Sequence, residues 1–168
     1  LLNDFRESSI GEEYIIKFIF VIDIRTSDSS KKIASEFSEM IIDQSETIGK
    51  GSAIKQAVEK WRDTPTELVI FLDADGSYSF KSVQKILMSL DSGSDVVSGS
   101  RFLSNAYRPE GMSRLHAFGN RFLSKVSSVR NMRKISDLCT GLWGFREEAL
   151  KRIKLNSKGF DLEAEIAG

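Results

Sequence analysis

The sequence predicts an α/β layered domain whose central sheet is largely parallel. Apolar runs of strand length alternate with helical patterns along the 168 residues, and this alternation is typical of parallel sheets covered by helices. Three of the predicted strands carry aspartate at or just beyond their ends, at Asp23, Asp43 and Asp73. Because ligands of open α/β sheets bind beyond the carboxyl ends of the strands, we expect a site at this edge.

The predicted elements follow one another without a linker, a repeat or a low-complexity tract. Apolar runs that end in turn residues indicate strands at Lys17–Asp23, Met40–Asp43, Glu67–Asp73, Asp95–Ser98 and Leu138–Phe145. Helical periodicity, with serines at several starts, indicates helices at Ser29–Ser38, Ser52–Arg62, Phe80–Leu90, Met112–Val129 and Glu147–Ile153, and a last one from about Phe160. We therefore expect one domain over residues 1–168.

Composition is that of an ordinary folded domain. Hydrophobic residues make up 40% of the chain, which is enough for one core, and a single cysteine, Cys139, excludes an internal disulfide and fits a reducing compartment. No apolar run approaches the roughly 18 residues that span a bilayer. Because the chain begins at Leu1 and stops just after a helix would begin, we expect a piece of a longer protein, truncated at both ends.

Charge is distributed unevenly although the net charge is zero. Residues 1–100 contain 11 basic and 17 acidic residues, whereas residues 101–158 contain 13 basic and 4 acidic ones. An acidic half followed by a basic half suits a ligand rich in phosphate. The alternative is a solvated surface whose opposite charges meet across the fold.

The segment Asp73-Ala74-Asp75 follows an apolar strand and precedes Gly76. The strand fixes the backbone and the glycine permits a sharp turn, so both carboxylates can face one cation. Mg²⁺ or Mn²⁺ prefers such oxygen ligands and completes its shell with water and substrate phosphates. The alternative is a pair of aspartates that cap a turn.

Two further segments in the first half of the chain indicate a nucleotide ligand. Gly49-Lys50-Gly51-Ser52 precedes a helix, so its backbone N–H groups and Lys50 can face an anion, although the spacing is not that of a P-loop. Asp23 ends its strand and can accept hydrogen bonds from a nucleobase or a ribose. The alternatives are a helix cap at Ser52 and a turn cap at Asp23.

The basic half contains the candidates for the second substrate. Arg101 follows a strand, and the next helix has a basic ridge, Arg114, Arg121 and Lys125, beside an apolar arc. Such a helix either packs on the core or lays its apolar side on a lipid while its ridge meets phosphate. Asp137, in "SDLCTGLWGFR", and the acids of "GFDLEAE", Asp161 among them, are candidates for a general base.

Taken in chain order, these motifs resemble the GT-A glycosyltransferases. The closest branch is the inverting, family 2-type one that includes the dolichyl-phosphate and other polyprenyl-phosphate sugar synthases. The resemblance runs from about Phe18 to the end of the chain. It rests on the segments "VIDIRTSDSS", "GKGSAIKQA", "FLDADGSY", "DVVSGSRF", "MSRLHAFGNRFLS", "SDLCTGLWGFR" and "GFDLEAE".

The resemblance implies a three-layer nucleotide-diphospho-sugar transferase fold and a role for each matching residue. Asp73 and Asp75 resemble the pair that binds the metal and the diphosphate. Asp23 resembles the acid that meets the nucleobase, and Lys50 lies in the donor-binding loop. The basic and acidic positions on the acceptor side are Arg101, Arg114, and either Asp137 or Asp161. The chain departs from the family pattern V-D-D-G-S, because Ile24 and Arg25 stand where a second acid and a glycine are usual.

The implied reaction transfers a sugar from a UDP- or GDP-linked donor to a polyprenyl phosphate, with inversion and with Mg²⁺ or Mn²⁺. The implied partners are the sugar nucleotide, the lipid acceptor and a membrane surface, and not nucleic acid; the implied location is the cytoplasmic face of a membrane. Three alternatives remain: a binding module without activity, a sugar nucleotidyltransferase, and a phosphatase of the haloacid dehalogenase type. The segment "FLDADGS" also resembles the nucleophile loop of that phosphatase type.

Overall fold

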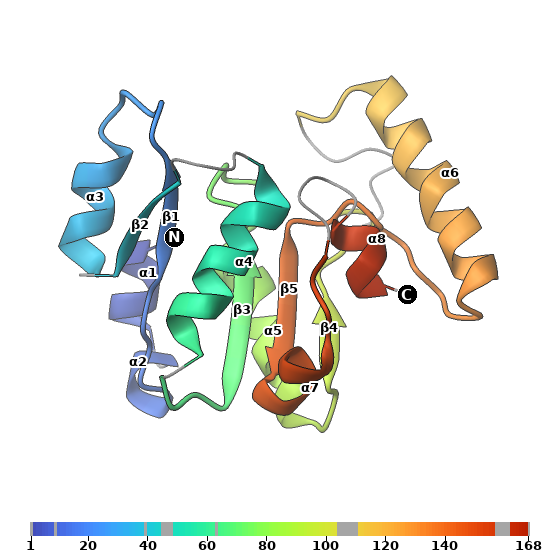
Figure 1. Cartoon of the computed structure of the whole chain (residues 1–168). Coiled ribbons are helices and arrows are strands. Elements are labelled where there is room, and N and C mark those ends of the chain that lie inside the picture. Colours follow the sequence, from blue (N-terminus) through green and yellow to red (C-terminus); the bar gives the residue numbers. More distant parts are fainter. Residues whose placement is uncertain are drawn as a thin grey trace. The chain divides into compact units, whose positions relative to one another are not determined.

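The computed structural model has an α/β structure that divides into two compact units (Figure 1). It describes residues 2–8, 10–38, 40–44, 49–62, 64–103, 111–156 and 162–167. The first unit comprises residues 1–66 with 157–160, and the second comprises residues 67–156 with 161–168.

In its described residues, the first unit contains a pair of parallel strands and four helices. Strand β1 (Phe20–Asp23) pairs with β2 (Ile41–Gln44), with Phe20 opposite Ile41 and Asp23 opposite Gln44. The helices are α1 (Leu2–Glu7), α2 (Ile10–Glu13), α3 (Ser30–Phe37) and α4 (Lys50–Trp61).

Aromatic packing forms the core of the first unit. The ring of Phe18 meets Phe5 edge-on with 5.7 Å between centroids, stacks on Phe20 at 5.9 Å, and meets Phe37 edge-on at 6.4 Å. Offset and edge-on pairs of this kind add to the burial of apolar area. Phe18 thus joins α1, β1 and α3.

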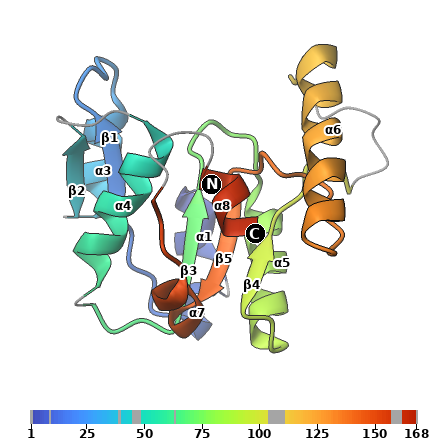
Figure 2. The same ribbon diagram turned by 45° about the vertical axis from the view of Figure 1, so that its right-hand side comes forward.

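The second unit contains a three-stranded sheet in the order β3-β5-β4. The strands are β3 (Leu68–Leu72), β4 (Val96–Ser98) and β5 (Leu142–Arg146). The helices are α5 (Phe80–Asp91), α6 (Arg114–Arg130), α7 (Glu147–Arg152) and α8 (Leu162–Ala167). Figure 2 shows β5 between its neighbours and α6 to the side of this sheet.

Strand β5 forms the core of the second unit. Leu142 and Phe145 are fully buried, and α5 packs against β5 through Ile86 and Leu90. A Cβ atom added at Gly144 would collide with the Ile86 side chain, so the approach of the helix to the strand requires glycine there.

The direction of β5 differs from the largely parallel sheet that the sequence predicts. β1 and β2 are parallel, but β5 is antiparallel to both β3 and β4. The burial of β5 on both faces explains the difference, because a continuous apolar run does not reveal strand direction. One consequence is that Leu142 lies opposite Leu72, so the chain enters β5 at the edge where β3 and β4 end.

The predicted elements are otherwise present, with shifts of one to four residues at most boundaries. Helix α4 starts at Lys50 with Gly49 as its N-cap (φ 132°), so Ser52 lies inside the helix rather than capping it. The short helices α1 and α2 were not predicted.

Candidate active site

The acidic turn lies at the end of β3. The backbone N–H of Asp73 donates to the carbonyl oxygen of Gly141 at 2.9 Å, which ties the turn to the segment that enters β5. A Cβ atom at position 141 would collide with the carboxylate of Asp73, so Gly141 is required for this approach. Gly76 then turns the chain with a φ of 80°.

Asp75 lies exposed in the same turn. Its Oδ1 accepts a hydrogen bond of 2.9 Å from the backbone N–H of Ser77. That bond lowers the pKa of the Asp75 carboxyl below its ordinary value, and the positive charge of Arg101 lowers it further. Asp75 therefore caps the turn, as in the alternative interpretation, and it is also ionised at neutral pH and accessible to a cation.

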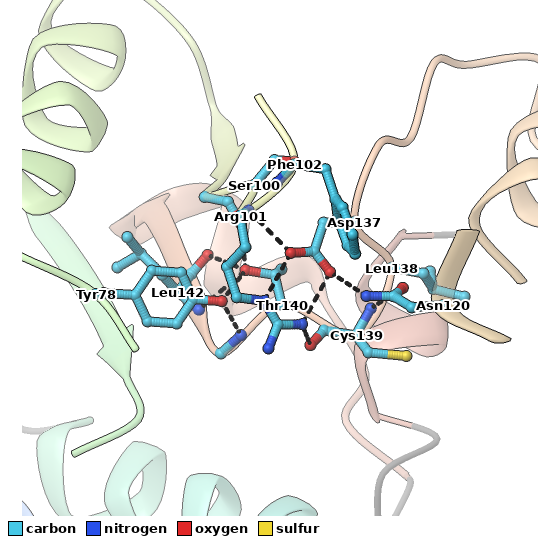
Figure 3. A network of polar contacts seen from close by, with 12 residues as sticks. Tyr78, Ser100, Arg101, Phe102, Asn120, Asp137, Leu138, Cys139, Thr140 and Leu142 are labelled. Atoms are coloured by element: carbon cyan, nitrogen blue, oxygen red, sulfur yellow. Dashed lines mark hydrogen bonds and ion pairs between the residues drawn. The ribbon is translucent and has the colours of Figure 1, made fainter. Parts of the chain in front are cut away.

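A chain of hydrogen bonds fixes the segment opposite this turn (Figure 3). The N–H of Gly141 donates to the Tyr78 hydroxyl at 2.8 Å. The same hydroxyl oxygen lies 2.8 Å from Thr140 Oγ1. Thr140 Oγ1 in turn bonds the carbonyl oxygen of Gly99. Since each hydroxyl has one proton, Thr140 donates to Gly99 and Tyr78 donates to Thr140. The acidic turn, the end of β4 and the start of β5 are thereby joined.

Arg101 is fixed by Asp137 in the same network (Figure 3). Asp137 Oδ2 accepts from the backbone N–H of Arg101 at 3.0 Å and from its Nε at 2.8 Å, and Oδ1 accepts from Nη2 at 3.0 Å. Nη2 also donates to the carbonyl oxygen of Cys139 at 2.5 Å. The bonds to Asp137 raise the pKa of the Arg101 guanidinium above its ordinary value. This arginine is a permanent, oriented cation.

Helix α6 contacts this network through a stripe of small polar side chains. Asn120 Nδ2 donates to Asp137 Oδ1 at 2.6 Å, and the hydroxyl of Ser124 accepts from the N–H of Leu138 at 2.8 Å. One turn further on, the Ser128 hydroxyl accepts from the N–H of Ile135 at 2.9 Å. The spacing of four residues places all three on one face of the helix.

The opposite face of α6 is apolar and exposed. Its residues are between 47% and 77% exposed, so in the described part of the chain this face does not pack on the core. Arg114, at the first position of α6, is also exposed, and the guanidinium of Arg121 lies 5.2 Å from the ring centre of Phe102. The exposed apolar face comprises Leu115, Phe118, Phe122, Leu123, Val126 and Val129.

Two candidate residues for binding the sugar nucleotide lie in the first unit: Asp23 at the end of β1 and Lys50 at the start of α4. Arg25 binds both carboxylate oxygens of Asp23, with Nη2 2.6 Å from Oδ2 and Nε 3.0 Å from Oδ1. These hydrogen bonds hold the pKa of Asp23 at about 2, below its usual 3.8. Lys50 is the first residue of α4. The unusual arginine at position 25 thus occupies part of the Asp23 carboxylate.

The second unit brings together Asp73, Asp75, Arg101 and Asp137 around the segment 137–141. Among the described residues, no group of three or more histidine, cysteine, aspartate or glutamate side chains is placed to hold a metal ion. Asp73 and Asp75 are hard oxygen ligands, and an ion on these two would need water and substrate oxygens to complete its shell. Asp161 lies outside the described residues.

Sequence reasoning missed the residues that hold the site together. Tyr78, Thr140, Asn120 and Ser124 lie inside the segments that carry the family resemblance, but those segments assigned them no role, and their partners are up to 63 residues away in the chain. One signal was present: Asn120, Ser124 and Ser128 recur every four residues opposite the apolar arc of α6.

An acidic turn and a fixed guanidinium at one edge of an α/β sheet indicate a class of protein that handles anionic ligands. The sequence matches Glycosyl transferase family 2 over residues 2–154. The chain belongs to this family.

Several curated proteins are similar to the chain. Glycosyltransferase AglJ of Haloferax volcanii is 30% identical over 99% of this chain and 52% of its own length. A dolichyl-phosphate hexose transferase of the same organism is 32% identical over 84% of this chain and 58% of its own length. The dolichol-phosphate mannosyltransferase of Pyrococcus furiosus is 22% identical over 84% of this chain and 40% of its own length. The chain therefore spans about half the length of these relatives.

Replacing Arg25 with alanine should raise the pKa of Asp23 from about 2 towards 3.8, because the hydrogen bonds that stabilise the carboxylate are lost. Since the carboxylate form is favoured in the folded protein, the pair's contribution to stability is complete above pH 3.8 and is lost as the pH falls through about 2. Carboxyl carbon shifts measured by NMR during a pH titration report this change. Lys31→Ala, which removes a partner of Asp43 instead, is the control; an unchanged Asp23 titration in Arg25→Ala would refute the pairing.

Replacing Tyr78 with phenylalanine should lower the free energy of unfolding by about 1–3 kcal/mol, because the Gly141 N–H and the Thr140 hydroxyl lose a buried partner. Urea denaturation measures the difference. Ser94→Ala, at an exposed loop position, is the control. A Tyr78→Phe protein as stable as the parent would mean that this hydroxyl does not hold the segment.

Proposed function

We propose that this chain is the catalytic domain of an inverting glycosyltransferase. It takes a sugar from a UDP- or GDP-linked donor and transfers it to a polyprenyl or dolichyl phosphate. The proposal includes a single three-layer GT-A domain over residues 1–168, the fold that family 2 implies. The observation that carries it is the acidic turn Asp73–Asp75 beside an arginine fixed at the same edge of one sheet. The names of two of the relatives, the dolichyl-phosphate hexose transferase and the dolichol-phosphate mannosyltransferase, support the acceptor class.

On the donor side, Asp73 and Asp75 are the residues that would hold Mg²⁺ or Mn²⁺. Their chemistry fits, since the exposed Asp75 is ionised and both supply hard oxygen ligands. Such an ion neutralises charge on the leaving nucleoside diphosphate when it is bound. In the first unit, we assign Asp23 and Lys50 to donor binding; the Arg25 contact keeps Asp23 ionised, and a donor would compete with Arg25 for the oxygens of this carboxylate.

On the acceptor side, Arg101 and Arg114 are the proposed contacts for the lipid phosphate. A phosphate monoester has a second pKa of about 6, so it is largely ionised at neutral pH and needs little help from a base. Its oxygen forms a bond to the anomeric carbon while the bond to the diphosphate oxygen breaks on the opposite face. A general base, Asp137 or Asp161, would be needed only for an alcohol acceptor.

We also propose that the domain works on the cytoplasmic face of a membrane, with α6 against the lipid. Its apolar face is exposed, and Arg114, Arg121 and Lys125 flank that face, as in helices that lie in a lipid interface. No helix in the described part of the chain is long and apolar enough to cross a bilayer.

Family membership decides against the phosphatase and the sugar nucleotidyltransferase interpretations, because the acidic turn follows β3 of a chain that matches the glycosyl transferase family over residues 2–154. A binding module without activity is the remaining alternative. The Asp23–Arg25 pair favours it, since this contact occupies oxygens assigned to the donor. Measured transfer separates the two.

Replacing Asp75 with asparagine should abolish metal-dependent sugar transfer, with a loss of about a hundredfold or more, because one of two anionic ligands is removed. Transfer of radiolabelled sugar from UDP- and GDP-sugars to a short prenyl phosphate measures it. The control is Asp95→Asn, an exposed aspartate away from the turn. Full activity in Asp75→Asn would exclude the metal assignment.

Replacing Phe118 and Phe122 with glutamate should weaken binding to vesicles of phosphatidylcholine and phosphatidylglycerol by about tenfold or more. The changes remove two exposed apolar side chains and add charge to the face proposed to enter the lipid. Cosedimentation with vesicles measures the affinity. Met88→Glu, at an equally exposed position on α5, is the control; equal binding by both variants would place the membrane contact elsewhere.

A further inference from the structure

We propose that Asp137 and Asn120 are positioning residues that hold Arg101 for the phosphate of the acceptor. This inference rests on the proposed function and deepens it, because it gives the acidic residue of "SDLCTGLWGFR" a task other than proton transfer. The hydrogen bonds that join the three side chains give each of them its role (Figure 3).

The carboxylate of Asp137 has no acceptor capacity left. Oδ2 accepts from the backbone N–H and the Nε of Arg101, and Oδ1 accepts from Nη2 of Arg101 and Nδ2 of Asn120. A carboxylate has about four lone-pair sites, and all are used. The side chain is also 0% exposed. An acceptor hydroxyl therefore has no route to Asp137. The carboxylate is placed to anchor Arg101 and not to take up a proton.

Arg101 is held along one edge and open along the other. Nε and Nη2 bind Asp137 and the Cys139 carbonyl, whereas Nη1 has no hydrogen-bond partner among the described residues. The side chain is 19% exposed. A planar guanidinium fixed in this way presents its remaining donors in one direction, which suits a phosphate oxygen.

Asn120 has its own orientation fixed from two sides. Its Oδ1 accepts from the hydroxyl of Ser124 and from the N–H of Cys139, both at 3.2 Å. The amide N–H₂ is therefore directed towards Asp137, where it donates at 2.6 Å. Because Asn120 belongs to α6, the position of Arg101 depends on that helix as well as on the segment 137–139.

The first test measures binding of a short-chain prenyl phosphate to the purified protein by calorimetry, with the prenyl alcohol as the blank. Asp137→Asn and Asn120→Ala should each weaken binding by about tenfold or more, and Asp95→Asn should leave it unchanged. In an Arg101→Lys background, Asp137→Asn should add little, because the two side chains act as a unit. Two results would overturn the inference. One is a loss of affinity in the double variant equal to the sum of the losses from Arg101→Lys and Asp137→Asn; the other is wild-type affinity in both Asp137→Asn and Asn120→Ala.

The second test separates positioning from proton transfer and from a fold defect. In steady-state transfer, the variants should raise KM for the prenyl phosphate more than they lower kcat, and the acidic limb of the kcat–pH profile should stay in place. Loss of that limb in Asp137→Asn would assign Asp137 as the base instead. The Arg101 Nε–H signal in ¹H–¹⁵N NMR should exchange slowly in the parent and fast in Asp137→Asn; slow exchange in both would also overturn the inference.

These readouts distinguish the inference from the proposed function. A protein that binds the prenyl phosphate through Arg101, Asp137 and Asn120 but transfers no sugar would remove the catalytic proposal and leave the positioning roles intact. A protein that transfers sugar with unchanged KM in Asn120→Ala and Asp137→Asn would remove the positioning roles and leave the function intact.

Discussion

The site depends on one buried contact, the Asp137 carboxylate that holds the guanidinium and the backbone of Arg101. Removing one partner of a buried ion pair costs about 3–5 kcal/mol, because the other charge is left without compensation. The same segment, through Thr140 and Gly141, also fixes the turn that contains Asp73. The segment 137–141 thus holds both Arg101 and the acidic turn Asp73–Asp75. The charge of Arg101 helps to keep Asp75 ionised.

The sequence predicted the pieces of this site better than their connections. The apolar run before Asp73 and the glycine at position 76 correctly located the acidic turn, since these are local features. The antiparallel direction of β5 was not predicted. Leu142 and Phe145 lie on opposite faces of this strand and are both buried, so the sequence shows no alternation of polar and apolar residues from which its place in the sheet could be inferred. Asn120 and Tyr78 were missed because their roles arise from contacts 17 and 63 residues away. Arg25 departs from the family pattern, but its contact with Asp23 depends on the direction that an exposed side chain takes, which the sequence does not determine.

Helix α6 has its faces reversed relative to an ordinary surface helix. Asn120, Ser124 and Ser128 face the protein, and Phe118 and Phe122 face outward. This arrangement is costly in water unless another apolar phase covers the outer face. The inner stripe has a second consequence, since it links the exposed helix to Asp137. The apolar face of α6, proposed to contact the lipid, and Arg101, proposed to contact the lipid's phosphate, would then be joined through Asn120 and Asp137.

The proposed transfer is measured most directly by the product formed from a prenyl phosphate and a panel of UDP- and GDP-sugars, with Mn²⁺ and with chelator. An inverting, metal-dependent enzyme forms a glycosyl prenyl phosphate whose anomeric configuration, determined by NMR, is opposite to that of the donor, and forms it only when metal is present. Product formed equally well in chelator, product with retained configuration, or absence of product with every donor would contradict it.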